Sequence, residues 1–268
     1  MSGTSANARA TRRRAAGFVV AFISAIAFSS ILAVACTNIS DNADAVLSLQ
    51  FDSLASPSVV LGDTLRDTTG AIALPVVHAF NYHGDEIAAA PIYFLSPDSG
   101  VTVDSATGIV VGDSLRSTPA RIIATISNLQ AVQKISVTLR PDSMAAVTVL
   151  DTLNYSTLDS TLNVSDLMSV KLLHGVPPND SAVPNYIVSL AIVSQSDPNL
   201  ALLINDAGKP SNIDTTDAGG IAGRKIRVHP LNLTATVDSV ILEATAKYRG
   251  QPVTGGPIRL VVVLQPRS

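Results

Sequence analysis

Residues 91–112 decide the fold class and read Pro-Ile-Tyr-Phe-Leu-Ser-Pro-Asp-Ser-Gly-Val-Thr-Val-Asp-Ser-Ala-Thr-Gly-Ile-Val-Val-Gly. The apolar run Pro91–Leu95 precedes a turn cluster at Ser96–Gly100, and a short β-branched run separates that cluster from a second one at Asp104–Gly108. Short apolar or β-branched runs bounded by Gly, Pro, Asp and Ser are typical of β-strands joined by tight turns. The stretch therefore predicts strands, not helices.

The same pattern extends in both directions from this stretch. Before residue 140 we expect further strands over Val46–Phe51, Ile72–Phe80, Arg121–Ile126 and Ala131–Leu139, with a turn at Asn81–Asp85. Beyond residue 140 the strand candidates are Ala145–Leu150, Leu167–Leu173, Tyr186–Val193, Leu200–Ile204, Lys225–Val228, Leu231–Val237, Ser239–Lys247 and Ile258–Leu264, with a hairpin turn at Tyr248–Pro252.

The composition supports an all-β protein. The chain has 268 residues, of which 47% are hydrophobic, so it can bury substantial cores. Its acids are 19 Asp and 2 Glu, and Asp favours turns whereas Glu favours helix interiors. No window carries an apolar stripe at helical spacing with caps. About seven short strands at this spacing predict a sandwich of two sheets.

The two halves of the chain echo each other. Phe94–Asp98 is matched by Ile192–Asp197, and Thr107–Gly112 by Gly219–Gly223. The spacing is about 100 residues, the length of one Ig-type unit. We therefore expect tandem sandwiches over residues 45–140 and 143–266, with the boundary near Arg140-Pro141-Asp142-Ser143 and Val176–Pro184 as an insertion in the second half.

Part of this pattern resembles a bacterial Ig-like domain. That family usually has a Gly-Asp pair before its second strand, a Trp in strand C and a "Val-Asp … Thr-Gly-Leu-Val" turn. The resemblance covers residues 45–140, with Phe94 where the Trp is expected, and is weaker over 143–266. It implies tandem Ig-like β-sandwiches, as in adhesins, surface-layer and cell-envelope proteins, and no common catalytic residues. The matching segments are Val60–Thr64, Asn81–Gly84, Phe94–Asp98 and Val103–Gly112.

The first 35 residues have the pattern of an export signal. They hold four arginines and no acid, and an uncharged apolar run follows over Ala15–Ala35. Leu32-Ala33-Val34-Ala35-Cys36 resembles the lipobox of bacterial lipoproteins, which implies cleavage before Cys36 and a lipid on its sulfur. Two or more acyl chains anchor a protein stably. Residues 36–44 then form a short tether.

An uncleaved helix is the alternative to lipidation. The apolar run has 21 residues, and a bilayer span needs about 20. Its Ala, Gly and Ser residues would permit close contact with other helices, as in an accessory subunit of a membrane protein complex. Both alternatives place the bulk of the chain on the outer side of a bacterial membrane, on the periplasmic side or at the cell surface, because Arg-rich flanks stay inside.

Charge argues against nucleic acid as a partner. The four leader arginines leave 14 basic and 21 acidic residues beyond residue 35, a net charge of −7 against −3 for the whole chain. Such a surface has no long-range attraction for phosphates. Glycan binding has thin support, from Tyr82 in a turn and Tyr155 in a polar stretch.

One motif suggests catalysis. Gly112-Asp113-Ser114-Leu115 spells the nucleophile motif of the GDSL esterases, which also need a helix after the Ser and a late Asp-x-x-His. Pro119 follows closely, and no histidine has Asp at that spacing. A Ser without a base is an ordinary hydroxyl. The near-copy Gly62-Asp63-Thr64-Leu65 favours a recurring turn, so we expect no catalytic residues.

No metal or cofactor site is expected. The four histidines, His78, His83, His174 and His229, are far apart in sequence, and one Cys excludes multi-cysteine zinc or iron–sulfur sites. Calcium prefers six to eight oxygen ligands, for which Asp214–Asp217 and the pair Asp98 and Asp104 are the best candidates. Asp is also the expected turn residue. The sequence thus predicts a non-enzymatic, envelope-anchored protein that touches a protein partner.

Overall fold

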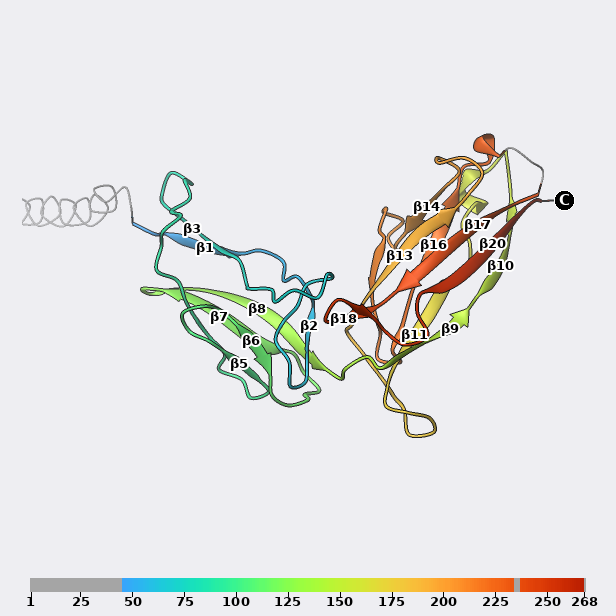
Figure 1. The fold of residues 1–268 in the computed structure, drawn as a ribbon. Coiled ribbons are helices and arrows are strands. Elements are labelled where there is room, and N and C mark those ends of the chain that lie inside the picture. Colours follow the sequence, from blue (N-terminus) through green and yellow to red (C-terminus); the bar gives the residue numbers. More distant parts are fainter. Residues whose placement is uncertain (1–44, 234–236, 268) are drawn as a thin grey trace, which may run out of the picture. The chain divides into compact units, whose positions relative to one another are not determined.

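A computed structural model describes residues 45–233 and 237–267 of the chain (Figure 1). These residues form β-strands, loops and two short 3-10 turns, η1 (Ser160–Leu162) and η2 (Pro230–Asn232), and they contain no α-helix. The all-β fold class is confirmed. The strands are β1 (Ser48–Phe51), β2 (Ser58–Val60), β3 (Val77–Phe80), β4 (Tyr93–Leu95), β5 (Val101–Val103), β6 (Val110–Gly112), β7 (Ala120–Ile126), β8 (Leu129–Thr138), β9 (Ser143–Thr148), β10 (Leu150–Tyr155), β11 (Met168–His174), β12 (Ser181–Ala182), β13 (Ile187–Ser194), β14 (Ala201–Ile204), β15 (Ile213–Thr215), β16 (Ile221–Val228), β17 (Asp238–Thr245), β18 (Lys247–Tyr248), β19 (Gln251–Pro252) and β20 (Ile258–Pro266).

The described residues divide into two compact units: 45–48 with 79–88, and 49–78 with 89–233 and 237–267. In the smaller unit the Leu47 amide donates to the Phe80 carbonyl at 2.8 Å. The side chain of Asn81 accepts from the amides of His83 and Asp85, both at 2.9 Å, which closes the predicted turn. The larger unit contains two β-sandwiches.

The first sandwich has a four-stranded sheet in the order β2-β8-β7-β4 and a separate hairpin, β5–β6. Side chains alternate along β7, so Ala120, Ile122, Ala124 and Ile126 are buried. A core forms where the sheet and the hairpin bury their apolar faces against each other. Its buried members are Val59, Leu65, Val101, Val110, Ala120, Ile122, Ile135 and Val137, and the partly buried Phe94 packs against them.

The second sandwich has two larger sheets. One has the order β10-β20-β17-β13-β15, and the other has the order β12-β11-β16-β14, with β9 also paired to β11. Along β11, β17 and β20, every second side chain points inward. These side chains are Leu, Val, Met or Ala, and all of them are fully buried. They are Met168, Val170, Leu172, Val240, Leu242, Ala244, Leu260, Val262 and Leu264.

Several expected strands differ from those observed. The expected strand Ala145–Leu150 is wrong as a single element, because the chain changes layer at Val149. β9 pairs with β11 in one sheet, whereas β10 lies parallel to β20 in the other. The expected strand Leu231–Val237 is wrong at its start, where Pro230 begins a 3-10 turn. Ile72–Phe80 is a strand only from Val77, after Pro75, which has no amide to donate.

The predicted leader over residues 1–35, the lipidation site Cys36 and the tether over 36–44 lie outside the described residues. Across the described ranges, no helix has the length and apolar character needed to cross a membrane. The domain boundary near residues 140–143 stays a prediction.

Candidate functional site

The esterase-like motif lies in a turn. Gly112 ends β6, and the amides of Asp113 and Ser114 both donate to the Gly100 carbonyl, at 2.8 and 3.3 Å. The near-copy lies beside it: the Gly62 amide donates to the Gly112 carbonyl at 2.7 Å, and the Gly112 amide donates to the Asp63 carbonyl at 3.0 Å. Both copies therefore occupy turns, and their backbones bind each other.

The histidines lie in separate places and hold local structure. His78 Nε2 lies 3.2 Å from an Asp52 carboxylate oxygen, and His174 Nδ1 lies 2.8 Å from one of Asp142. The His229 amide donates to the Leu200 carbonyl at 2.7 Å, where η2 begins.

The Asp carboxylates considered above as calcium ligands accept hydrogen bonds from other residues or form ion pairs with them. Asp98 accepts from the Arg121 side chain at 2.9 and 3.0 Å, and this guanidinium lowers the pKa of the Asp98 carboxyl to about 2. Asp214 lies 2.6 Å from Arg224 Nη1. Asp104 and Asp217 each accept from amides of the turn that follows them. Among residues 45–233 and 237–267, no group of three His, Cys, Asp or Glu side chains could hold a metal ion.

The two tyrosines that suggested a glycan surface differ. Tyr82 is exposed in its turn, with its ring 3.6 Å from that of His83. Tyr155 is only 7% exposed and belongs to the core of the second sandwich, so the expectation of an exposed ring there is wrong. Its inward direction follows from the alternation of β10, which also buries Leu153.

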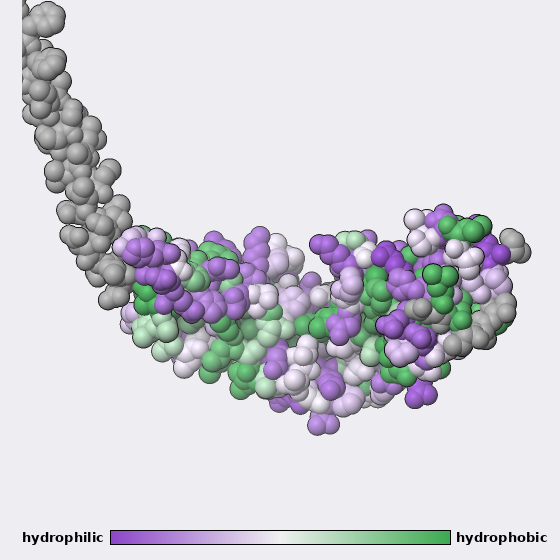
Figure 2. Space-filling model, turned by 90° about the horizontal axis from the view of Figure 1, so that it is seen from above, coloured by the Kyte–Doolittle hydropathy of each residue, from purple (hydrophilic) through white to green (hydrophobic). Residues whose placement is uncertain are grey.

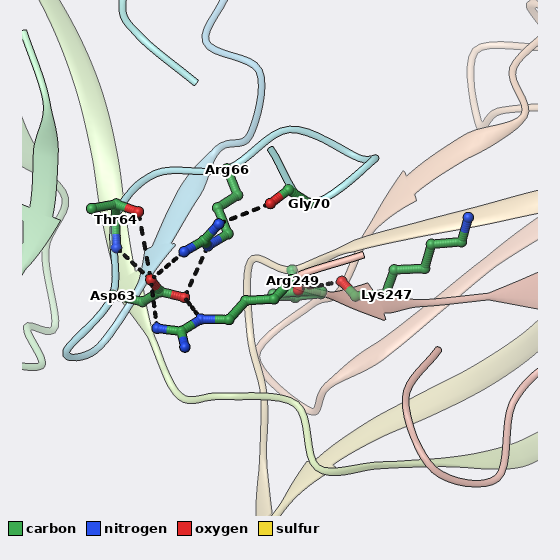
Figure 3. A network of polar contacts seen from close by, with 7 residues as sticks. Asp63, Thr64, Arg66, Gly70, Lys247 and Arg249 are labelled. Carbon is green, nitrogen blue, oxygen red and sulfur yellow. Dashed lines mark hydrogen bonds and ion pairs between the residues drawn. The ribbon is translucent and has the colours of Figure 1, made fainter. Parts of the chain in front are cut away.

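The structure also contains a polar cluster around Asp63 that the sequence did not predict (Figure 3). Asp63 follows Gly62, whose φ of +72° permits the tight turn after β2. The Asp63 side chain is 4% exposed, and it accepts two side-chain bonds from Arg66 (both 3.1 Å) and two from Arg249 (2.9 and 3.0 Å). The Thr64 amide and hydroxyl also donate to it, at 2.8 and 3.5 Å. One carboxylate is thus held by two bidentate guanidinium groups. We name Asp63, Arg66 and Arg249 the Asp63 fork.

The Asp63 fork keeps its carboxylate ionised. Burial by itself would raise the pKa of the Asp63 carboxyl, because it disfavours the charged form. The hydrogen bonds from Arg249 and Arg66 outweigh burial and hold that pKa well below its usual value. The negative charge is therefore stable across the physiological pH range.

Arg249 reaches Asp63 from a hairpin whose turn matches the prediction. β18 and β19 pair around Arg249 and Gly250, whose φ values are +49° and +80°. Gly70 and Gly250 are in close backbone approach, since a Cβ on Gly70 would fall 1.9 Å from the Gly250 nitrogen. The Tyr186 hydroxyl donates to the Lys247 carbonyl at 2.6 Å, which ties the hairpin to the start of β13.

A cleft of about 630 Å³ lies beside the Asp63 fork. Its lining residues include Ser58, Ser189, Thr245, Glu243 and Lys247. The short motif Gly62-Asp63-Thr64-Leu65 signalled a turn, but nothing local indicated a partner 186 residues further along the chain.

No protein-family model matches the chain, and no curated protein matches it. Solved structures similar to it include S-layer protein SbsC domains 4 and 5, at 10% identity and a TM-score of 0.29, covering 82% of this chain and 97% of that one. The S-layer protein rSbsC(31-844) matches at 10% identity and a TM-score of 0.29, covering 81% of this chain and 27% of that one. Human protocadherin-24 EC1-2 matches at 18% identity and a TM-score of 0.25, covering 81% and 98%.

Proposed function

We propose that this chain is an exported, envelope-anchored protein of Ig-like sandwiches that works by touching a protein partner and not by catalysis. Two features support the proposal. The leader and Cys36 have the pattern of a lipoprotein signal. Ser114 lies in a turn, and His78, His174 and Asp214 form ion pairs at separate places.

The observation that carries the proposal is an apolar row on the outer face of the first sandwich. Leu95 of β4 lies opposite Ile123 of β7, which lies opposite Val132 of β8. Leu95 is 42% exposed and Val132 is 51% exposed, and Tyr93 on the same face of β4 is 58% exposed. Apolar side chains gathered on a sheet face are typical of an interaction surface. Figure 2 shows hydrophobic residues at the surface in separate places among hydrophilic ones.

The row also lies at a sheet edge, since β4 ends the order β2-β8-β7-β4. Beside it on the same face, Arg121 of β7 lies opposite Lys134 of β8, and both side chains are exposed. The Arg121 guanidinium is bound by Asp98, so a partner that covered the row would meet apolar surface with the exposed Lys134 side chain next to it. Edge strands and exposed apolar faces are common modes of protein recognition.

Photo-crosslinking in the native cells tests this function. A crosslinking amino acid at Leu95 should give a discrete adduct with an envelope protein, because this side chain lies in the proposed contact. The matched control is Leu158, which is 98% exposed and lies outside both core clusters. Adducts at Leu158 but not at Leu95, or none at either position, would contradict the proposal.

The absence of catalysis has its own test. Purified protein and its Ser114→Ala variant should hydrolyse a chromogenic ester at the same background rate, since Ser114 lies in a turn without a base bound to it in the described structure. Hydrolysis that disappears in Ser114→Ala would mean that the chain is an esterase.

A further inference from the structure

We propose that the Asp63 fork is an ionic lock that holds the two sandwiches in one fixed orientation. Asp63 and Arg66 belong to the first sandwich, and Arg249 belongs to the β18–β19 hairpin of the second. The shared carboxylate therefore bonds to both sandwiches at once (Figure 3).

The geometry of the contact suits a lock. A bidentate guanidinium–carboxylate pair fixes direction as well as distance, which a single hydrogen bond does not. The carboxylate is buried and cannot exchange its partners freely with water, while the Arg249 side chain is half-exposed. Removing one partner of such a buried pair destabilises the fold, because the other charge is left unpaired, and the intact pair selects one arrangement among several.

Contacts at other places hold the same arrangement. The buried hydroxyls of Thr138 and Ser58, both in the first sandwich, donate to the carbonyls of Pro184 and Asn185 at 2.6 Å each. Gly70 and Gly250 meet through their backbones. Beside the Asp63 fork, the described parts of the two sandwiches therefore also meet at the glycine pair and at the hydroxyls bound to residues 184–185.

The connection between the sandwiches is also tied down. Arg140 Nε lies 2.6 Å from Asp142, and the second Asp142 oxygen accepts from the Gly175 amide at 2.8 Å. The connection between β8 and β9 is residues 139–142, and the Asp142 carboxylate in it is bound at the end of β11. This attachment limits how far one sandwich can rotate against the other. With a fixed orientation, a partner bound to one sandwich could contact the second sandwich at a constant position.

Electron–electron double resonance tests the lock in the full chain. Spin labels on Asn128→Cys and Ala207→Cys, in a background of Cys36→Ser and in detergent, report the distance between an exposed turn of each sandwich. The lock predicts one narrow distance distribution. It predicts a broader peak in Arg249→Gln, because the hydrogen bonds of Thr138 and Ser58 alone hold the orientation less tightly; the substitution changes a half-exposed hairpin side chain and removes no core contact.

The matched control is Asp98→Ala, which removes a similar fork, from Arg121, inside the first sandwich. This variant should keep the narrow peak. A narrow peak that persists in Arg249→Gln, a broad distribution in the unsubstituted chain, or broadening in Asp98→Ala equal to that in Arg249→Gln would each overturn the lock. Circular dichroism of every variant confirms that the β-fold is intact.

Discussion

At Asp63, hydrogen bonds from Thr64, Arg66 and Arg249 converge on a single buried carboxylate. Asp63→Ala should lower the free energy of unfolding by about 2 kcal/mol, because hydrogen bonds to a charged group are lost and the Arg66 guanidinium keeps only its bond to the Gly70 carbonyl. Urea denaturation measures this. Asp206→Ala, which changes an exposed loop, should leave the midpoint unchanged. Equal midpoints in the two variants would show that the Asp63 fork contributes nothing to stability.

The lowered pKa of Asp63 also predicts how stability depends on pH. A free Asp has a pKa of about 4, and the folded value is the lower one, so the carboxylate contributes fully above about pH 4 and its contribution is lost as pH falls through the folded value. Tyr186 and Tyr248 have pKa values raised by burial and stay neutral in this range.

The expected result is a difference in unfolding free energy between the unsubstituted chain and Asp63→Ala that is constant from about pH 5 to 8 and shrinks below about pH 4. Urea titrations at a series of pH values test it. A difference that changes between about pH 6 and 7 would instead indicate a histidine as the titrating group.

Among the elements, two turns share the same combination of a glycine with positive φ and an Asp side chain that accepts amide hydrogen bonds. Gly108 and Gly220 have φ values of +75° and +76°, and each follows an Asp that accepts amide hydrogen bonds within the turn. Gly220→Ala should destabilise more than Gly62→Ala. Both positions have positive φ, but a Cβ on Gly220 would lie 2.6 Å from the Leu172 carbonyl, whereas Gly62 has open space. Thermal unfolding of both variants measures this, and the opposite order would contradict the turn geometry.

Strands with clear alternation were predictable from sequence. β7 and β8 match Arg121–Ile126 and Ala131–Leu139 to within two residues, because alternating burial fixes which side chains point inward. The turns at Asn81–Asp85 and Tyr248–Pro252 are confirmed for a similar reason, since Asn and Gly have specific roles in turns.

Other features depend on contacts distant in sequence. The change of layer at Val149 depends on β20, because the Val261 amide donates to the Val149 carbonyl at 2.8 Å. The burial of Tyr155 depends on the same neighbouring strand. The Asp63 fork needs a hairpin from the far end of the chain, and a single sequence gives no local signal for such a pairing.

At the scale of the molecule, the two sandwiches have separate cores with no residue in common. Leu242→Ala should cost about 3 kcal/mol, because it leaves a cavity in the second core. Hydrogen exchange should then accelerate in β13, β17 and β20 and stay unchanged in β7. Equal acceleration in β7 would mean that the two cores unfold as one unit. Leu158→Ala, at a side chain that is 98% exposed, should change neither region.

The proposed function depends on where the molecule is held. Residues 36–44 can span at most about 30 Å when fully extended, so a lipid on Cys36 would keep the first sandwich close to a membrane. The apolar row of Tyr93, Leu95, Ile123 and Val132 would then meet partners in the cell envelope.

Envelope anchoring is tested by the intact mass and N-terminal chemistry of the protein extracted from the membranes of its own cells. We expect a chain that begins at Cys36 and carries the mass of attached acyl groups. A chain that begins at an unmodified Met1 would contradict it.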